Sequence, residues 1–111
     1  MNTDDFRRMA LSFPDTVESS HMNHPDFRAN GKIFATLPNP ESGYAMVKLP
    51  PEQQAAFVEL DPSAFAPVNG GWGRQGATNV RLKTVKEESL LGALTVAWQN
   101  VSQKKPGRKP G

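Results

Sequence analysis

One segment of this 111-residue chain combines residue types that could do chemistry: between Pro67 and Leu82, Trp72 stands among four glycines. A glycine-rich turn could present Trp72 as an exposed platform while backbone N–H groups meet a phosphate. The same glycines could instead provide turns with positive φ, with Trp72 packed over the sheet edge at the rim of the core. The segment lacks the GxxxxGK[ST] pattern and precedes a predicted strand, which excludes a nucleotide-binding P-loop.

Cations accompany this segment and the predicted strands around it. Arg74, Arg81 and Lys83 follow the tryptophan, and Lys32 and Lys48 lie on neighbouring predicted strands. Together they could form a cationic strip on the outer face of a sheet, where each neutralised phosphate would release counterions and make binding depend on salt. The alternative is an ordinary solvated sheet face, on which Lys and Arg are normal occupants.

The C-terminal segment holds a second group of cations: Lys104, Lys105, Arg108 and Lys109. Without these four, the 13 basic residues fall to 9 against 11 acidic ones, so the remaining body carries about −2 although the whole chain carries +2. Any polyanion site on that body must be a local patch. We expect residues 103–111 to be disordered, either as a solubilising end or as a basic arm that loosely resembles an AT-hook, interrupted by Lys109.

The residues that could bind a metal are few. The spacing of His21 and His24 could bring the two imidazoles together if the segment turns, with Asp26 nearby, whereas in one strand it would point them to opposite faces. Two histidines and one acid fall short of a zinc set. Asp4 and Asp5 at the start of the chain are followed at once by two arginines, which would repel iron. The sequence therefore predicts no metal site and no cofactor.

Catalysis and membrane insertion lack support in the sequence as well. The chain has no cysteine, and no acid, base and nucleophile are spaced as a catalytic set, so we expect no catalytic residue, no small-molecule substrate and no enzymatic activity. No apolar run approaches the ~20 residues that span a bilayer, and the first five residues lack the basic-then-apolar order of a signal peptide. We expect a cytoplasmic protein with no membrane contact.

The elements that must position these residues follow from periodicity. Apolar residues at helical spacing predict a first helix that ends at Pro14 and a helix over about 85–102. Prolines tolerated at a helix start and the Asp61–Pro62 stop predict a short helix over 51–60. Between 17 and 49 the period becomes two, which predicts an antiparallel meander in which Lys32 and Lys48 point outward. Short strands are expected over 65–68 and 78–83. The result is a two-layer α+β domain over residues 1–102, an antiparallel sheet backed by N- and C-terminal helices.

The order of several sequence blocks resembles the MmcQ/YjbR-like family of small bacterial proteins. The matching blocks are Ser20–Arg28, Gly31–Leu37, Val47–Leu49 and Gly71–Leu82. This resemblance covers about residues 6–101 and implies a CyaY-like fold, shared with frataxin-like proteins, and a role in binding double-stranded DNA.

Three functional hypotheses remain. The leading one is weak, phosphate-directed binding of double-stranded DNA by Arg74, Arg81 and Lys83, with Trp72 at the edge of the site and the tail cations adding attraction. The second is a protein-interaction module that uses the exposed sheet face and Trp72 as an apolar anchor. The third is a metal-handling protein.

Overall fold

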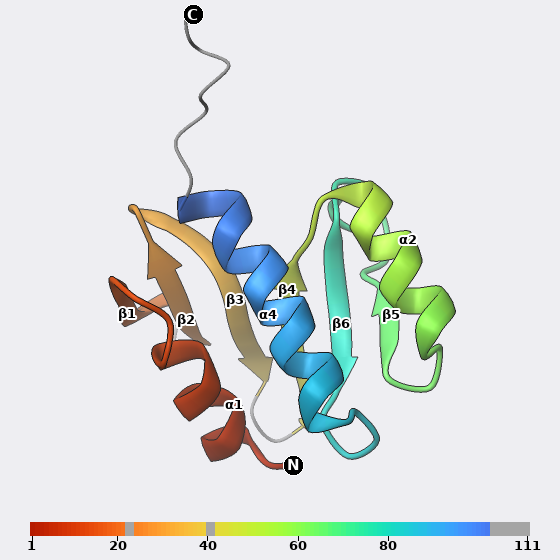
Figure 1. Ribbon diagram of the computed structural model, residues 1–111, viewed down its shortest axis with the longest axis horizontal. Helices are drawn as coiled ribbons and strands as arrows, with labels where there is room; N and C mark the ends of the chain where they lie inside the picture. Colours follow the sequence, from red (N-terminus) through yellow and green to blue (C-terminus); the bar gives the residue numbers. More distant parts are fainter. Residues whose placement is uncertain (22–23, 40–41, 103–111) are drawn as a thin grey trace, which may run out of the picture.

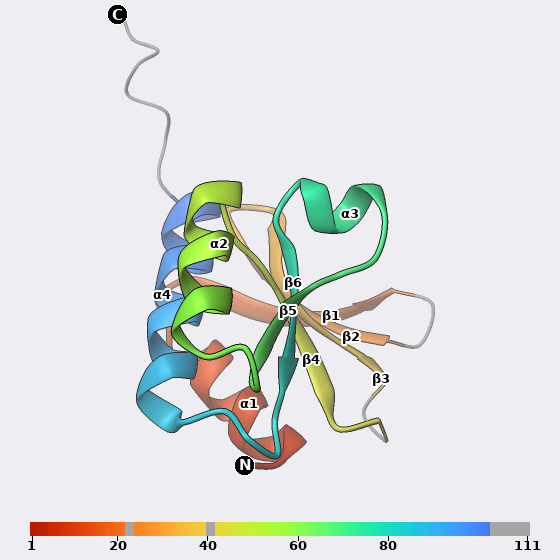
Figure 2. The ribbon, with the colours of Figure 1, turned by 90° about the vertical axis from the view of Figure 1, so that its right-hand side faces the viewer.

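A six-stranded antiparallel sheet, covered on one face by helices, forms the protein (Figures 1 and 2). The computed structural model describes residues 1–21, 24–39 and 42–102. The elements in chain order are α1 (Thr3–Leu11), β1 (Thr16–His21), β2 (His24–Ala29), β3 (Lys32–Asn39), β4 (Tyr44–Lys48), α2 (Pro51–Leu60), β5 (Phe65–Pro67), α3 (Gly71–Arg74), β6 (Ala77–Arg81) and α4 (Glu87–Ser102). The predicted two-layer α+β architecture is confirmed.

The strand order is β1-β2-β3-β4-β6-β5. The first four strands form the expected meander, and the Asn30–Gly31 turn has both residues at positive φ (56° and 75°), as a two-residue hairpin with right-handed strand twist requires. The chain then leaves the sheet through α2 and returns at the far edge as β5 before β6 pairs with β4. Strands β4 and β6, distant in sequence, therefore lie side by side.

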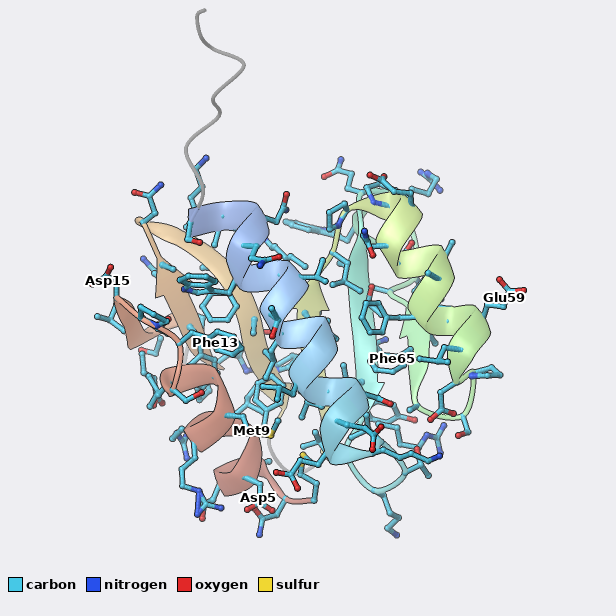
Figure 3. All side chains as sticks on the ribbon, in the orientation of Figure 1. Asp5, Met9, Phe13, Asp15, Glu59 and Phe65 are labelled. Carbon is cyan, nitrogen blue, oxygen red and sulfur yellow. The ribbon has the colours of Figure 1, made fainter. Side chains whose placement is uncertain are left out.

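Helices α1, α2 and α4 lie together on one face of the sheet, and Figure 2 shows that the short α3 lies on the opposite side. Aromatic rings fill the layer beneath the helices: Phe13 stacks on Trp98 with centroids 5.7 Å apart, and Phe57 of α2 meets Phe65 at 5.4 Å. Figure 3 shows Phe13 between α1 and α4 and Phe65 beneath α2, whereas Glu59 points away from the core. Among the described residues, α3 is the only helix on the other sheet face.

The predicted elements are present, and most of their boundaries differ from the expectations by one to three residues. Helix α2 spans the predicted residues, and α4 starts two residues later than its approximate predicted start. Strand β6 ends at Arg81, two residues before the predicted end. The segment expected to be a glycine turn contains a single helical turn, α3, at Gly71–Arg74. The predicted disordered tail, with its four cations, lies outside the described residues.

Candidate functional site

The open face of the sheet is built around the β4–β6 pair. Cross-strand partners on this pair are Tyr44 with Arg81, Met46 with Asn79, and Lys48 with Ala77. The residues between them on β4, Ala45 and Val47, are fully buried under the helices. Because side chains alternate along a strand and cross-strand partners share a face, these three pairs point away from the helical layer.

At one end of this pair, Trp72 projects from α3 and is 65% exposed. The Lys48 ammonium lies 5.9 Å from the centre of its ring, which is within cation–π range. Beside the pair is a small hollow of about 130 Å³, whose lining includes Ala77 and the carboxamide side chains of Gln75 and Asn100. Trp72 is therefore an exposed ring with a cation beside it, and the interpretation that it packs at the rim of the core is wrong.

At the other end, the Arg81 guanidinium lies over the Tyr44 ring at 5.3 Å from its centre. Tyr44 is half-buried and Arg81 is exposed. A second hollow, of about 300 Å³, adjoins this pair and is lined on its polar side by Asn69 and Asn79. The open face therefore carries an aromatic–cation pair at each end of β4, and each pair borders a hollow that contains two carboxamides.

The glycines next to Trp72 are required by close backbone contacts and by positive φ angles. A Cβ at Gly73 would lie 1.7 Å from the Val68 carbonyl oxygen, and one at Gly76 would lie 1.7 Å from the Leu49 carbonyl oxygen. Gly70 and Gly76 also have positive φ, at 82° and 112°. Gly70, Gly73 and Gly76 thus meet the steric and conformational needs of the chain around α3.

A buried glutamine holds this loop in place. Gln54 of α2 is 8% exposed, and its Nε2 donates toward Gly73 O, Ala77 O and Thr78 Oγ1 at 2.9, 3.0 and 3.1 Å. The amide thereby joins the helical layer to α3 and to the start of β6. Sequence reasoning missed this residue, although a polar side chain on the inner side of a predicted helix is the signal that could have found it.

The β2 end of the open face is electrically neutral. Asp26 is 1% exposed and accepts two hydrogen bonds from Arg28, at 2.9 and 3.2 Å. The hydrogen bond to this carboxylate, followed by its charge, raises the pKa of Arg28 above its ordinary value. Because Arg28 is committed to Asp26, the free cations of the open face lie toward β4 and β6. The Asp26–Arg28 pair was also missed at the level of sequence.

The five predicted cations of the domain do not form one strip. Lys48 and Arg81 lie at opposite ends of the β4–β6 pair, Arg74 lies on α3, and Lys83 lies in the turn after β6. Lys32 was predicted on the outer face of the sheet, and the structure contradicts this prediction.

The reason for the Lys32 error is a register shift between β2 and β3. Phe27 pairs with Ala35 while Arg28 pairs with Ile33, so Phe34 is an extra residue on β3. Both Phe34 and Ala35 are fully buried. For the residues of β3 that precede this bulge, the bulge exchanges the side chains that point to the two faces of the sheet. Lys32 pairs with Ala29, which belongs to the core. Lys32 therefore lies on the helical side of the sheet.

The charges of the described residues segregate between the two faces. From Pro62 to Lys86 the chain contains four cations and no Asp or Glu. Helices α2 and α4 carry two Glu residues each and no Lys or Arg. The segment that builds α3 and β6 is thus cationic, while two of the three covering helices are acidic.

The residues considered for metal binding are arranged differently from the expectation. His21 and His24 are partners across the β1–β2 pair, so they lie on two strands, as the alternative in which the segment turns requires, and the alternative of a single strand is excluded. Within residues 1–21, 24–39 and 42–102, no three His, Asp or Glu side chains gather as a metal site.

The acids of α1 are used locally. Asp4 pairs with Arg7, and Asp5 pairs with Arg8 while bonding to the Asn2 backbone N–H in a capping box. The pKa of Asp5 is lowered, first by its hydrogen bond with the Asn2 backbone; burial opposes this shift, and the Arg8 charge adds to it.

The sequence of the chain matches the YjbR family model over residues 11–100. The chain belongs to the YjbR family. A DUF419-domain protein of this fold, DR2400 from Deinococcus radiodurans, superposes with a TM-score of 0.77 at 20% identity, covering 93% of this chain and 80% of the other. A protein from Pseudomonas syringae gives a TM-score of 0.66 at 16% identity, with coverage of 91% and 99%. Curated proteins give no significant sequence match.

These similarities confirm the expected family and fold and name no activity. None of the described helices has the length and apolar character needed to cross a membrane.

Proposed function

We propose that the protein is a non-enzymatic nucleic-acid-binding protein that contacts the phosphates of double-stranded DNA with the open face over β4, α3 and β6. The observation that carries the proposal is the segregation of charge. Lys48, Arg74, Arg81 and Lys83 belong to this side of the molecule or its rim, and the stretch from Pro62 to Lys86 contains no acid that could neutralise them.

The acidic helices support one orientation of the complex. Glu52 and Glu59 on α2 and Glu87 and Glu88 on α4 would be repelled by a phosphate backbone, so the helical layer faces away from the DNA. Four phosphate contacts would give an affinity that falls about 100-fold between about 50 and 200 mM salt, because about 0.9 counterion is released for each neutralised phosphate. Contacts of this kind carry no sequence information, so we expect little preference among duplex sequences.

The test is fluorescence anisotropy of a labelled duplex with the full chain, over a series of salt concentrations. Lys48→Gln/Arg81→Gln should weaken binding and reduce the slope of log affinity against log salt by about 2. Arg7→Gln/Arg8→Gln is the matched control, since it removes the same charge from α1 and should leave the slope unchanged. A variant with all four tail cations replaced by Gln measures the share of the tail. Equal effects of the two double variants, or binding that only the tail variant abolishes, would refute the role of the open face.

A protein partner is the second candidate, and the 65% exposure of Trp72 favours it. Exposed tryptophans often anchor protein interfaces. Such a complex should survive high salt and be lost on Trp72→Ala, whereas the phosphate contacts are lost in salt.

A further inference from the structure

Binding to phosphates gives a role to Lys48 and Arg81 but none to the rings of Trp72 and Tyr44 that lie beside them. We propose that this face preferentially holds unpaired nucleotides, with bases stacking at Trp72 and at the Tyr44–Arg81 pair while Lys48 and Arg81 contact phosphates. The inference rests on the proposed nucleic-acid binding and names the form of nucleic acid that the site takes. In a duplex, the faces of the bases are covered by their neighbours, and only an unpaired base can stack on a protein ring.

The Trp72 end has the features of a stacking position. The ring is 65% exposed, and it stands on a loop held in place by Gln54. Little conformational entropy should therefore be lost when a base covers it. The Lys48 ammonium lies 5.9 Å from the ring centre, close enough to meet the phosphate of the nucleotide whose base lies on the ring. The adjoining hollow is lined by Gln75 and by Asn100, which lies near the C-terminal end of α4, away from the acids at its start, and each of these carboxamides has a donor and an acceptor for the edge of a base.

The Tyr44 end repeats this combination with different residues. The Arg81 guanidinium already lies 5.3 Å from the centre of the Tyr44 ring, and a planar guanidinium is itself a surface on which bases stack. The adjoining hollow of about 300 Å³ contains the carboxamides of Asn69 and Asn79. One aromatic next to a cation occurs on many protein surfaces. Two such pairs, each beside two carboxamides, match the mixed stacking, charge and hydrogen-bonding demands of a nucleotide.

The spacing and shape of the face also favour a single strand. Lys48 lies four positions after Tyr44 on β4, which at about 3.3 Å per residue places the two ends about 13 Å apart. A flexible strand can reach both ends. A duplex can meet this face only with its phosphates, because contact with its bases needs a protruding helix or ribbon in the major groove, and this face presents a broad sheet and a helix of four residues, Gly71–Arg74.

Charge identifies a nucleic acid as the occupant in preference to an apolar protein segment. The side chains nearest to Trp72 and Tyr44 on this face include Lys48 and Arg81, and the surrounding stretch from Pro62 to Lys86 is free of acids. A polyanion with aromatic bases complements both the charges and the rings. An apolar partner would instead bury these cations without a counter-charge, which is costly.

The experiment compares the affinity of the full chain for an oligothymidylate of about 12 nucleotides with that for a duplex carrying about the same number of phosphates, at one low salt concentration. We expect tighter binding of the single strand. Trp72→Ala and Tyr44→Ala should each lower single-strand affinity by about 5- to 100-fold and leave duplex affinity within about twofold. Trp72→Phe should restore most of the loss. Leu60→Ala, which removes an exposed apolar side chain from α2, is the control and should change neither affinity. Thermal unfolding of each variant checks that the fold is retained.

The outcomes separate this inference from the proposed function. Equal or tighter binding of the duplex, or no effect of Trp72→Ala and Tyr44→Ala on the single strand, overturns the preference for unpaired nucleotides while phosphate binding stands. An equal loss of both nucleic acids in the two alanine variants also overturns it, because the rings would then support the face without stacking on bases. If neither nucleic acid binds, both proposals fail.

Discussion

Replacing Gln54 by leucine tests how the loop that carries Trp72 is held. The Gln54 amide has two N–H hydrogens for three acceptors at 2.9–3.1 Å, so about two hydrogen bonds are lost. A buried bond contributes about 0.5–1.5 kcal/mol net, which gives a loss of about 1–3 kcal/mol in the free energy of unfolding. Gly73 O and Ala77 O keep the backbone partners Gly76 and Val68, which limits the cost.

The measurement is chemical and thermal unfolding of the full chain. A loss of about 1–3 kcal/mol should lower the melting temperature by about 5–20 °C in a domain of this size. Gln53→Leu makes the same chemical change at the adjacent, exposed position of α2 and should stay within about 0.5 kcal/mol of the wild type. If the Gln54 and Gln53 variants are equally stable, Gln54 does not join α2 to α3 and the reasoning fails.

Two further predictions concern the backbone and pH. Gly73→Ala should lower the free energy of unfolding by at least about 3 kcal/mol, because the new Cβ would lie 1.7 Å from the Val68 carbonyl oxygen. Gly71→Ala is the control and should fold normally, since the nearest atom to its Cβ is 3.7 Å away. Similar unfolding curves for the two variants would contradict this steric account. The pKa of Asp5 is lowered in the folded protein, so the Asp5 carboxylate stabilises the fold above the ordinary carboxyl pKa, and this stabilisation is lost as pH falls through the folded pKa. Asp5→Asn should therefore flatten the acid side of the curve of unfolding free energy against pH. An unchanged curve would contradict the capping box with Asn2.

Much of the fold could be predicted from local sequence patterns. Apolar spacing was sufficient to predict α1, and the period of two between residues 17 and 49 was sufficient to predict the meander of β1 to β4. These elements depend on interactions that are close in sequence. The bulge that turns Lys32 toward the helical side needs the register with β2, and alternation within β3 alone cannot reveal it.

The site was only partly predictable because long-range contacts assemble it. The cations Lys48 and Arg81 are visible in the sequence, but the pairing of Tyr44 with Arg81 follows from β6 returning beside β4 after α2 and β5. Two glycines in the four residues of α3 argue against a helix locally. That turn forms where Gly73 packs closely on the chain and Gln54 reaches it from α2.

The most direct test of nucleic-acid binding by the open face is an NMR titration of the full chain with duplex DNA at low salt. The two indole N–H signals give an internal comparison, since Trp72 lies on the open side while Trp98 belongs to α4 on the helical side and donates its indole N–H to the Pro14 carbonyl at 3.0 Å. The largest shifts are expected at the Trp72 indole and at the amides of Lys48 and Arg81, with the Trp98 indole unmoved. Shifts concentrated on α1, α2 and α4, with the open face unchanged, would contradict the account.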